Sequence, residues 1–142
     1  MANVKFNYAD KKLSISNKSK LKSFILTIFE EENIILHELN YIFCSDEYLL
    51  QINKDYLNHD FYTDIITFSL EEEGEPVIGE IYISLDRIKD NALTQNTNIL
   101  NETLRVIFHG CLHLCGYLDK EEKDIAVMRK KEDYYINKYL GL

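Results

Sequence analysis

The stretch that most constrains the fold is residues 98–116, NILNETLRVIFHGCLHLCG. We predict a helix that Gly116 ends, because glycine is common just after the last residue of a helix. At about 100° per residue, His109 and His113 share one face about one turn apart. Two imidazoles at that spacing can reach the same metal ion, so the fold must bury this helix and still present both histidines together.

The cysteines of this stretch point elsewhere. Cys111 and Cys115 share a second face, roughly 200° from the histidines, so one ion cannot use both pairs. We expect both cysteines to pack against a sheet as small apolar residues. With Cys44 the chain has three cysteines. An odd number without an export signal argues against a disulfide framework.

The rest of the chain predicts strands and helices that follow one another. We expect strands at 3–9, 37–45, 64–72 and 76–85, and helices at 17–34, 45–57, 86–96, 98–116 and 120–140. Ser45 is a predicted helix cap, and Gly74 and Pro76 place a turn between two neighbouring strands. The pattern predicts an α+β (mixed α/β) domain, with a small mixed four-stranded sheet and about five helices.

Composition limits the classes of protein that are possible. The net charge is −8, the wrong sign for a protein that coats nucleic acid by charge alone, although an RNA enzyme with a local basic patch remains possible. No apolar run approaches the ~20 residues that span a bilayer, so we expect no membrane association. The beginning of the chain carries no apolar signal segment, so we expect a cytoplasmic protein.

Two histidines need a third ligand to hold a metal. Gly116 lets the chain turn back, and Asp119 follows three residues later, as in zinc motifs where helix, glycine turn and third ligand come at fixed offsets. Three protein ligands leave an open position for water, which is typical of a catalytic site. The alternative is that His109 and His113 are satisfied core histidines and that Asp119 caps the next helix.

The residue after His109 bears on whether the metal site could hydrolyse peptides. In metallopeptidases with a His-Glu-x-x-His helix, the glutamate is the general base for the zinc-bound water. Gly110 occupies that position here. A conventional peptidase is therefore not expected.

Three sequence blocks resemble the YbeY family, the bacterial rRNA-maturation endoribonucleases. HGCLHLCGYLD at 109–119 is similar to H-G-x-L-H-L-x-G-Y-D-H, INKDYLNHDFYTDIITFSL at 52–70 to L-N-x-x-Y-R-x-K-D-x-P-T-D-V-L-S-F, and GEIYIS at 79–84 to G-D-I-x-I-S. The matching positions are His109, Gly110, Leu112, His113, Leu114, Gly116 and Tyr117, together with Asn53, Tyr56, Asp60, Thr63, Asp64 and Phe68.

The resemblance implies one zincin-like metal-hydrolase domain over residues 1–142 that binds one zinc ion, or another divalent transition metal, and no dinucleotide cofactor. It implies cleavage of precursor rRNA near the 3′ end of the small-subunit rRNA, a part in ribosome quality control, and contact with the small ribosomal subunit and its proteins. His109 and His113 carry over as ligands. The family's third ligand is a histidine, and gap-free alignment puts Asp119 there, whereas a one-residue insertion would put Lys120 there; we prefer Asp119 because it is a competent ligand.

The chain departs from the family where basic residues are expected. Leu57 replaces an arginine that would hold a phosphate by a bidentate contact, and His59 replaces a lysine. His59 and the Arg129-Lys130-Lys131 run are partial substitutes, but we expect that run to be a solvated helix face.

No general base is assigned from the sequence. The weak catalytic candidates are Asp64, Thr63, Glu80 and His59. Thr63 and Asp64 either orient groups near the metal or form a turn before a strand, and Glu80 is a candidate for the wall of the site. Glu102 lies seven residues before His109 on the same helix face, where it either orients a ligand histidine or is exposed two turns away, and we expect exposure.

The sequence is also compatible with two other functions. A ribosome-associated assembly factor could hold the metal structurally with weak or no nuclease activity, and the loss of the family arginine at Leu57 favours it. A metal-dependent hydrolase could instead act on a substrate other than RNA.

Overall fold

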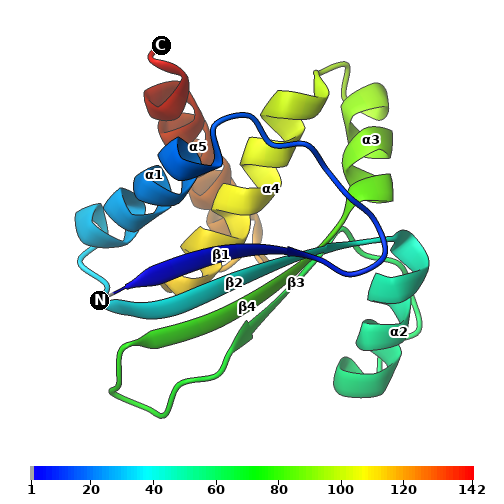
Figure 1. Cartoon of the computed structure of the whole chain (residues 1–142), viewed down its shortest axis with the longest axis horizontal. Coiled ribbons are helices and arrows are strands. Elements are labelled where there is room, and N and C mark those ends of the chain that lie inside the picture. The colour runs from blue at the N-terminus through cyan, green and yellow to red at the C-terminus, as the bar shows by residue number, and fades with distance from the viewer. Residues whose placement is uncertain (1) are drawn as a thin grey trace.

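The computed structural model describes residues 2–142 and contains every strand and helix that the sequence predicts, with ends shifted by a few residues (Figure 1). The strands are β1 (Asn3–Tyr8), β2 (Leu36–Cys44), β3 (Ile65–Ser69) and β4 (Val77–Ser84). The helices are α1 (Lys18–Glu31), α2 (Asp46–Leu57), α3 (Leu85–Thr94), α4 (Ile99–Leu114) and α5 (Glu122–Leu140). The predicted cap is confirmed, because Ser45 Oγ accepts a hydrogen bond from the backbone N–H of Tyr48 at 3.1 Å.

Within residues 2–142, the strands form one four-stranded sheet in the order β1-β2-β4-β3. β1, β2 and β4 run parallel, and β3 lies antiparallel to β4 at one edge. The predicted mixed sheet is therefore confirmed, as is the turn between the last two strands, where Gly74 has a φ of 83°. Parallel neighbours require long crossover connections, and helices of this chain supply them.

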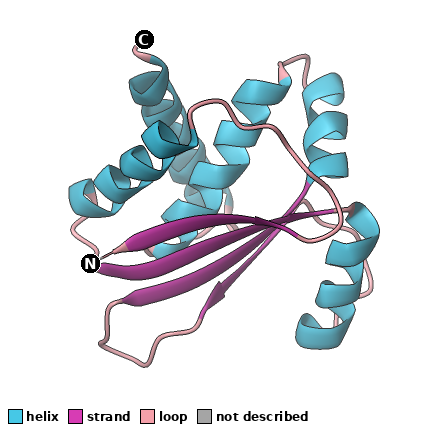
Figure 2. Cartoon of the chain, in the orientation of Figure 1, coloured by secondary structure: helices cyan, strands magenta, loops and turns pink. Residues whose placement is uncertain are grey.

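The two faces of the sheet are covered by different helices. Successive side chains of a strand point to opposite faces. Ile81 and Ile83 of β4 join the large core with α1, α4 and α5, whereas Ile66 of β3 joins a small core under α2 with Leu49 and Ile52. Figure 2 shows α1, α4 and α5 on one side of the sheet and α2 beyond the other. The edge strand β3 also contacts α4.

Helix α4 ends as the sequence predicts. Gly116 has a φ of 104°, a left-handed conformation that favours glycine. Its N–H donates to His113 O at 3.0 Å, and the N–H of Tyr117 donates to Leu112 O at 3.1 Å. These paired bonds close the helix and turn the chain back along it.

The cysteines of α4 pack into the core, as expected. Cys111 is fully buried, and Cys115 is half-buried against the same apolar cluster. Burial raises the pKa of the Cys111 thiol well above its ordinary value. The side of α4 that carries these thiols therefore serves packing and leaves the other side free for the histidines.

Gly110 lies where α4 packs tightly against the sheet. A Cβ atom there would lie 2.8 Å from Ile81 Cδ1 and 3.0 Å from Ile65 Cδ1. Real Cβ atoms do not approach other carbons so closely without a shift of the neighbours. The glutamate of the peptidase motif is therefore absent from a position that faces the sheet, where any side chain would require Ile81 and Ile65 to shift.

No helix in the described part of the chain combines the length and the apolar character needed to cross a membrane.

Candidate metal centre

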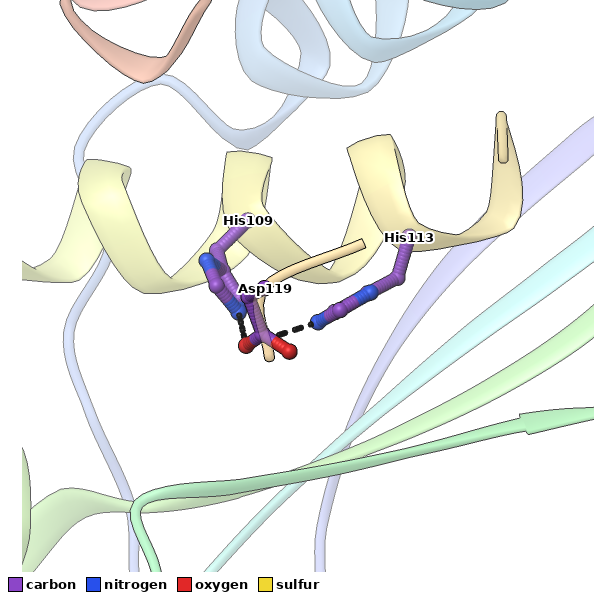
Figure 3. A group of neighbouring side chains, drawn as sticks. All are labelled: His109, His113 and Asp119. Atoms are coloured by element: carbon purple, nitrogen blue, oxygen red, sulfur yellow. Dashed lines mark hydrogen bonds and ion pairs between the residues drawn. The ribbon is translucent and has the colours of Figure 1, made fainter. Parts of the chain in front are cut away.

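The predicted ligands converge at the end of α4. His109 Nε2 lies 3.1 Å and His113 Nε2 3.2 Å from the same Asp119 oxygen, Oδ2 (Figure 3). The three ligand atoms all lie within 4.8 Å of one another. Each side chain is partly exposed: 19 % for His109, 24 % for His113 and 40 % for Asp119. The group thus opens to solvent on one side.

Local structure explains this convergence. The two histidines lie one turn apart on α4, and the turn at Gly116 returns the chain past them. Helix α5 begins at Glu122 with Glu121 as its N-cap. Asp119 therefore does not cap that helix, and this part of the alternative is wrong.

Each histidine ring is held through its other nitrogen. His109 Nδ1 lies 2.6 Å from Glu132 Oε2, and His113 Nδ1 lies 2.9 Å from the backbone oxygen of Tyr117. A carboxylate and a carbonyl only accept hydrogen bonds, so both Nδ1 atoms donate. In a neutral ring the Nε2 lone pair then points at the Asp119 carboxylate.

This arrangement fits a divalent transition metal. Two imidazole lone pairs and a carboxylate oxygen face one another, and a cation between them would compensate their mutual repulsion. Two nitrogens and one oxygen are suitable donors for zinc, and the hydrogen bonds at the Nδ1 atoms are the outer contacts that metal-bound histidines ordinarily have. Without a metal ion, a proton on Nε2 would donate to the Asp119 carboxylate in its place.

Glu132 is the residue of this site that the sequence prediction missed. Its side chain is only 6 % exposed, and its second oxygen accepts from Arg105 Nη1 at 2.9 Å. The Arg105 guanidinium also donates to Asp133 Oδ1 at 2.7 Å. A signal existed in the sequence, because Glu132 falls at helical spacing among the buried residues Met128 and Tyr135 of α5.

The electrostatics of His109 reflect these neighbours. Burial alone would lower the pKa of His109, but the hydrogen bond and charge of Glu132, together with the charges of Asp119 and Asp64, outweigh it and raise the pKa. A metal ion that binds at Nε2 must displace any proton on that nitrogen, whereas Nδ1 keeps its proton toward Glu132.

The ligands line a cleft of about 950 Å³ between α4, α5, α3 and the edge strand β3. Thr63, Asp64 and His59 also line this cleft. Glu80 is not among the lining residues, and it accepts a hydrogen bond from Tyr82 at 2.5 Å. The structure thus brings three of the four weak candidates to the metal site, and their catalytic roles stay predictions.

Asp64 has the most perturbed surroundings of these candidates. Burial raises the pKa of its carboxyl, against the opposing charge of His109. Asn91 Nδ2 lies 3.5 Å from Asp64 Oδ2. A half-buried carboxylate in the same cleft as a candidate metal centre is a candidate proton acceptor, because acid–base groups work best with a pKa moved toward the working pH.

The expectation that Glu102 is exposed is wrong. Only 4 % of its surface is accessible, because α3 and α5 pack against α4 on either side of it. Burial raises the pKa of Glu102. Among the described residues, its Oε2 atom has no hydrogen-bond partner.

Comparisons with known proteins agree with this geometry. The family model described as "Endoribonuclease YbeY" matches residues 4–140. A protein of that name from Cytophaga hutchinsonii is 48 % identical over 87 % of this chain and 87 % of its own length. A second, from Flavobacterium johnsoniae, is 42 % identical over 92 % of each chain.

The fold also has a counterpart among solved structures. A protein of Thermotoga maritima, solved in solution, superposes with a TM-score of 0.64 at 27 % identity, over 99 % of this chain and 90 % of that one. Two-fifths or more of the positions are identical in the curated relatives, and their matches extend over most of the chain. This chain is therefore a member of the endoribonuclease YbeY family.

Proposed function

We propose that this protein is a metal-dependent endoribonuclease that holds one zinc ion, or another divalent transition metal, on His109, His113 and Asp119. Its proposed substrate is precursor rRNA near the 3′ end of the small-subunit rRNA, in the cytoplasm and in contact with the small ribosomal subunit. Residues 1–142 would act as one domain. The observation that carries the proposal is the convergence of the two Nε2 atoms on Asp119 Oδ2 at 3.1 and 3.2 Å, in a chain of this family.

The residues divide the work as follows. When bound, the ion would supply Lewis-acid stabilisation of negative charge on the phosphodiester and would lower the pKa of water. Glu132 and the carbonyl of Tyr117 keep the Nε2 lone pairs directed at the ion. Asp64, half-buried in the wall of the cleft, would accept the proton of the attacking water.

The test compares metal content and RNA cleavage in the same preparations. We expect the purified protein to carry about one equivalent of metal and to cleave a model precursor of the small-subunit rRNA 3′ end. His113→Ala and Asp119→Ala each remove one of three ligands and should lose both properties. Lys130→Ala is the matched control, because Lys130 is exposed on α5 and does not line the cleft.

Each other outcome has a definite meaning. Metal bound at full occupancy without metal-dependent cleavage would leave an assembly factor with a structural metal. Absence of stoichiometric metal from the wild-type protein would overturn the site itself. Full metal content in Asp119→Ala would remove Asp119 from the ligand set while the two histidines stay.

A further inference from the structure

The segment between α2 and β3 presents stacked aromatic rings to the metal cleft. The rings of His59 and Phe61 lie 5.0 Å apart at an interplanar angle of 21°. Both residues line the same cleft as the ligand histidines. Phe61 nevertheless exposes 55 % of its surface. Open aromatic surface beside a catalytic centre is more typical of a binding site than of a solvated loop.

This segment is fixed from beneath by Asn53. Its side chain is buried, and Nδ2 donates to the backbone oxygen of Phe61 at 2.8 Å. The backbone oxygen of Asn53 accepts a hydrogen bond from the N–H of His59 at 3.0 Å. Asn58 closes α2 in the left-handed conformation, with a φ of 57°. The backbone that carries the two rings is thus held in place before any ligand arrives, which reduces the entropy cost of binding.

The cleft offers few positive charges to the RNA backbone: its lining holds Lys120 and two arginines, and both arginines lie close to carboxylates. Arg105 is engaged by Glu132 and Asp133, and Arg129 lies 3.8 Å from Glu132. Leu57 lines the cleft where the family motif has its arginine. With a net charge of −8 on the chain, contacts that do not depend on charge must supply a larger share of the affinity.

We propose that His59 and Phe61 form a stacking subsite for one nucleobase of single-stranded RNA, next to the phosphodiester held at the metal centre. Every base has a π-face, and stacking on an aromatic side chain is tolerant of sequence. Inside a duplex both faces of a base are already covered by its neighbours, so the subsite takes unpaired strands. The inference rests on the proposed ribonuclease function and adds where the strand is held.

The test measures binding rather than catalysis. A fluorescent single-stranded oligoadenylate is titrated with metal-free protein, so that the strand stays intact. The titration is repeated with zinc-loaded protein, and the fluorescence change is read immediately after mixing, before the strand is cleaved. We expect Phe61→Ala to weaken binding about tenfold in both forms, within the range for loss of one stacked base. Phe61→Trp should bind at least as tightly as the wild type.

Two controls isolate stacking from other effects. Tyr134→Ala removes an aromatic ring that is 47 % exposed on α5 and does not line the cleft, and it should leave the affinity unchanged. An oligonucleotide of the same length with abasic sites should bind the wild type about as weakly as the normal strand binds Phe61→Ala. Thermal melting of Phe61→Ala checks that the segment change leaves the fold intact.

The outcomes separate this inference from the function on which it rests. If the wild type binds and cleaves RNA while Phe61→Ala binds as tightly as the wild type, only the stacking subsite is overturned. If abasic and normal strands bind the wild type equally, the bases are not read by stacking, and the subsite is again overturned. If the wild type neither binds nor cleaves RNA, the proposed function falls and the subsite falls with it.

Discussion

Each ligand histidine donates from Nδ1, but the two acceptors differ in kind. His113 uses a backbone carbonyl four residues away, whereas His109 uses the buried carboxylate of Glu132. A carboxylate carries a full charge and raises the basicity of the ring more than a carbonyl does. The charge of Glu132 is balanced in turn by Arg105 at 2.9 Å. The hold of His109 on a metal should therefore depend on a residue that is not itself a ligand.

Replacement of Glu132 by glutamine tests that dependence. Glu132→Gln keeps the shape of the side chain and removes its charge, so we expect metal affinity to fall by about 10–100-fold. Competition with a chromophoric chelator measures this. Asp133→Asn is the matched control, because Asp133 contacts the same arginine but not His109. Equal losses in the two variants would show that the arginine network, rather than the contact with His109, matters.

The residue scale also shows what a sequence can predict about a site. His109, His113 and Asp119 were predicted because a regular helix and a glycine turn fix their relative positions. Glu132 lies 23 residues beyond His109, and only the packing of α5 against α4 brings the two together. The error at Glu102 has the same origin, because burial of a helix face depends on which neighbours cover it. The periodicity of a sequence predicts the faces of each helix but does not predict which other element covers them.

At the scale of elements, the fit of α4 against the sheet is controlled by Gly110. We expect Gly110→Ala to destabilise the fold by about 1 kcal/mol, because overpacking costs about 1–3 kcal/mol and the gain in helix propensity returns about 1 kcal/mol. The midpoint of urea unfolding measures this. In the same background, Ile81→Val removes the Cδ1 atom that a new Cβ would meet at 2.8 Å, and stability should partly recover. Purely additive effects of the two substitutions would contradict the close contact.

The elements themselves were easier to predict than their order in the sheet. Alternation and helical spacing predicted each strand and helix, and the short turn at Gly74 predicted that β3 and β4 are neighbours. The parallel pairing of β4 with β2 has no local signal, because β4 begins more than 30 residues after β2 ends. Such pairings are decided by how helices cover the two faces of the sheet.

At the scale of the whole molecule, the candidate metal centre connects separate parts of the chain. The ligands join α4 to the segment before α5, and Glu132 joins α5 to the same centre. The segment is held on its other side as well, because Glu32, just after α1, accepts from the Tyr117 hydroxyl at 2.6 Å and lies 3.0 Å from Lys131 Nζ. A ligand that binds only this assembled arrangement stabilises the entire fold.

Zinc should therefore raise the temperature of unfolding. At a free concentration one hundred times its dissociation constant, a ligand of the folded state adds about 2.7 kcal/mol. Calorimetry with zinc, and again after a chelator is added, should show a rise and its reversal. His113→Ala should melt at a temperature that zinc does not change. A zinc-dependent shift of wild-type size in that variant would place the ion elsewhere on the protein.

The close contact at Gly110 also limits which substitutions the helix can accept at this position. Replacement of Gly110 by glutamate would give the chain the letters His-Glu-x-x-His, which a motif search assigns to peptidases. The Cβ atom of the new side chain would lie 2.8 Å from Ile81 Cδ1, on the sheet side of the helix and among apolar atoms. Such a variant would gain the motif without gaining a base at the metal. A change from the glycine motif to the glutamate motif would therefore also require changes at Ile81 and Ile65. Comparison of the motifs alone does not reveal this requirement.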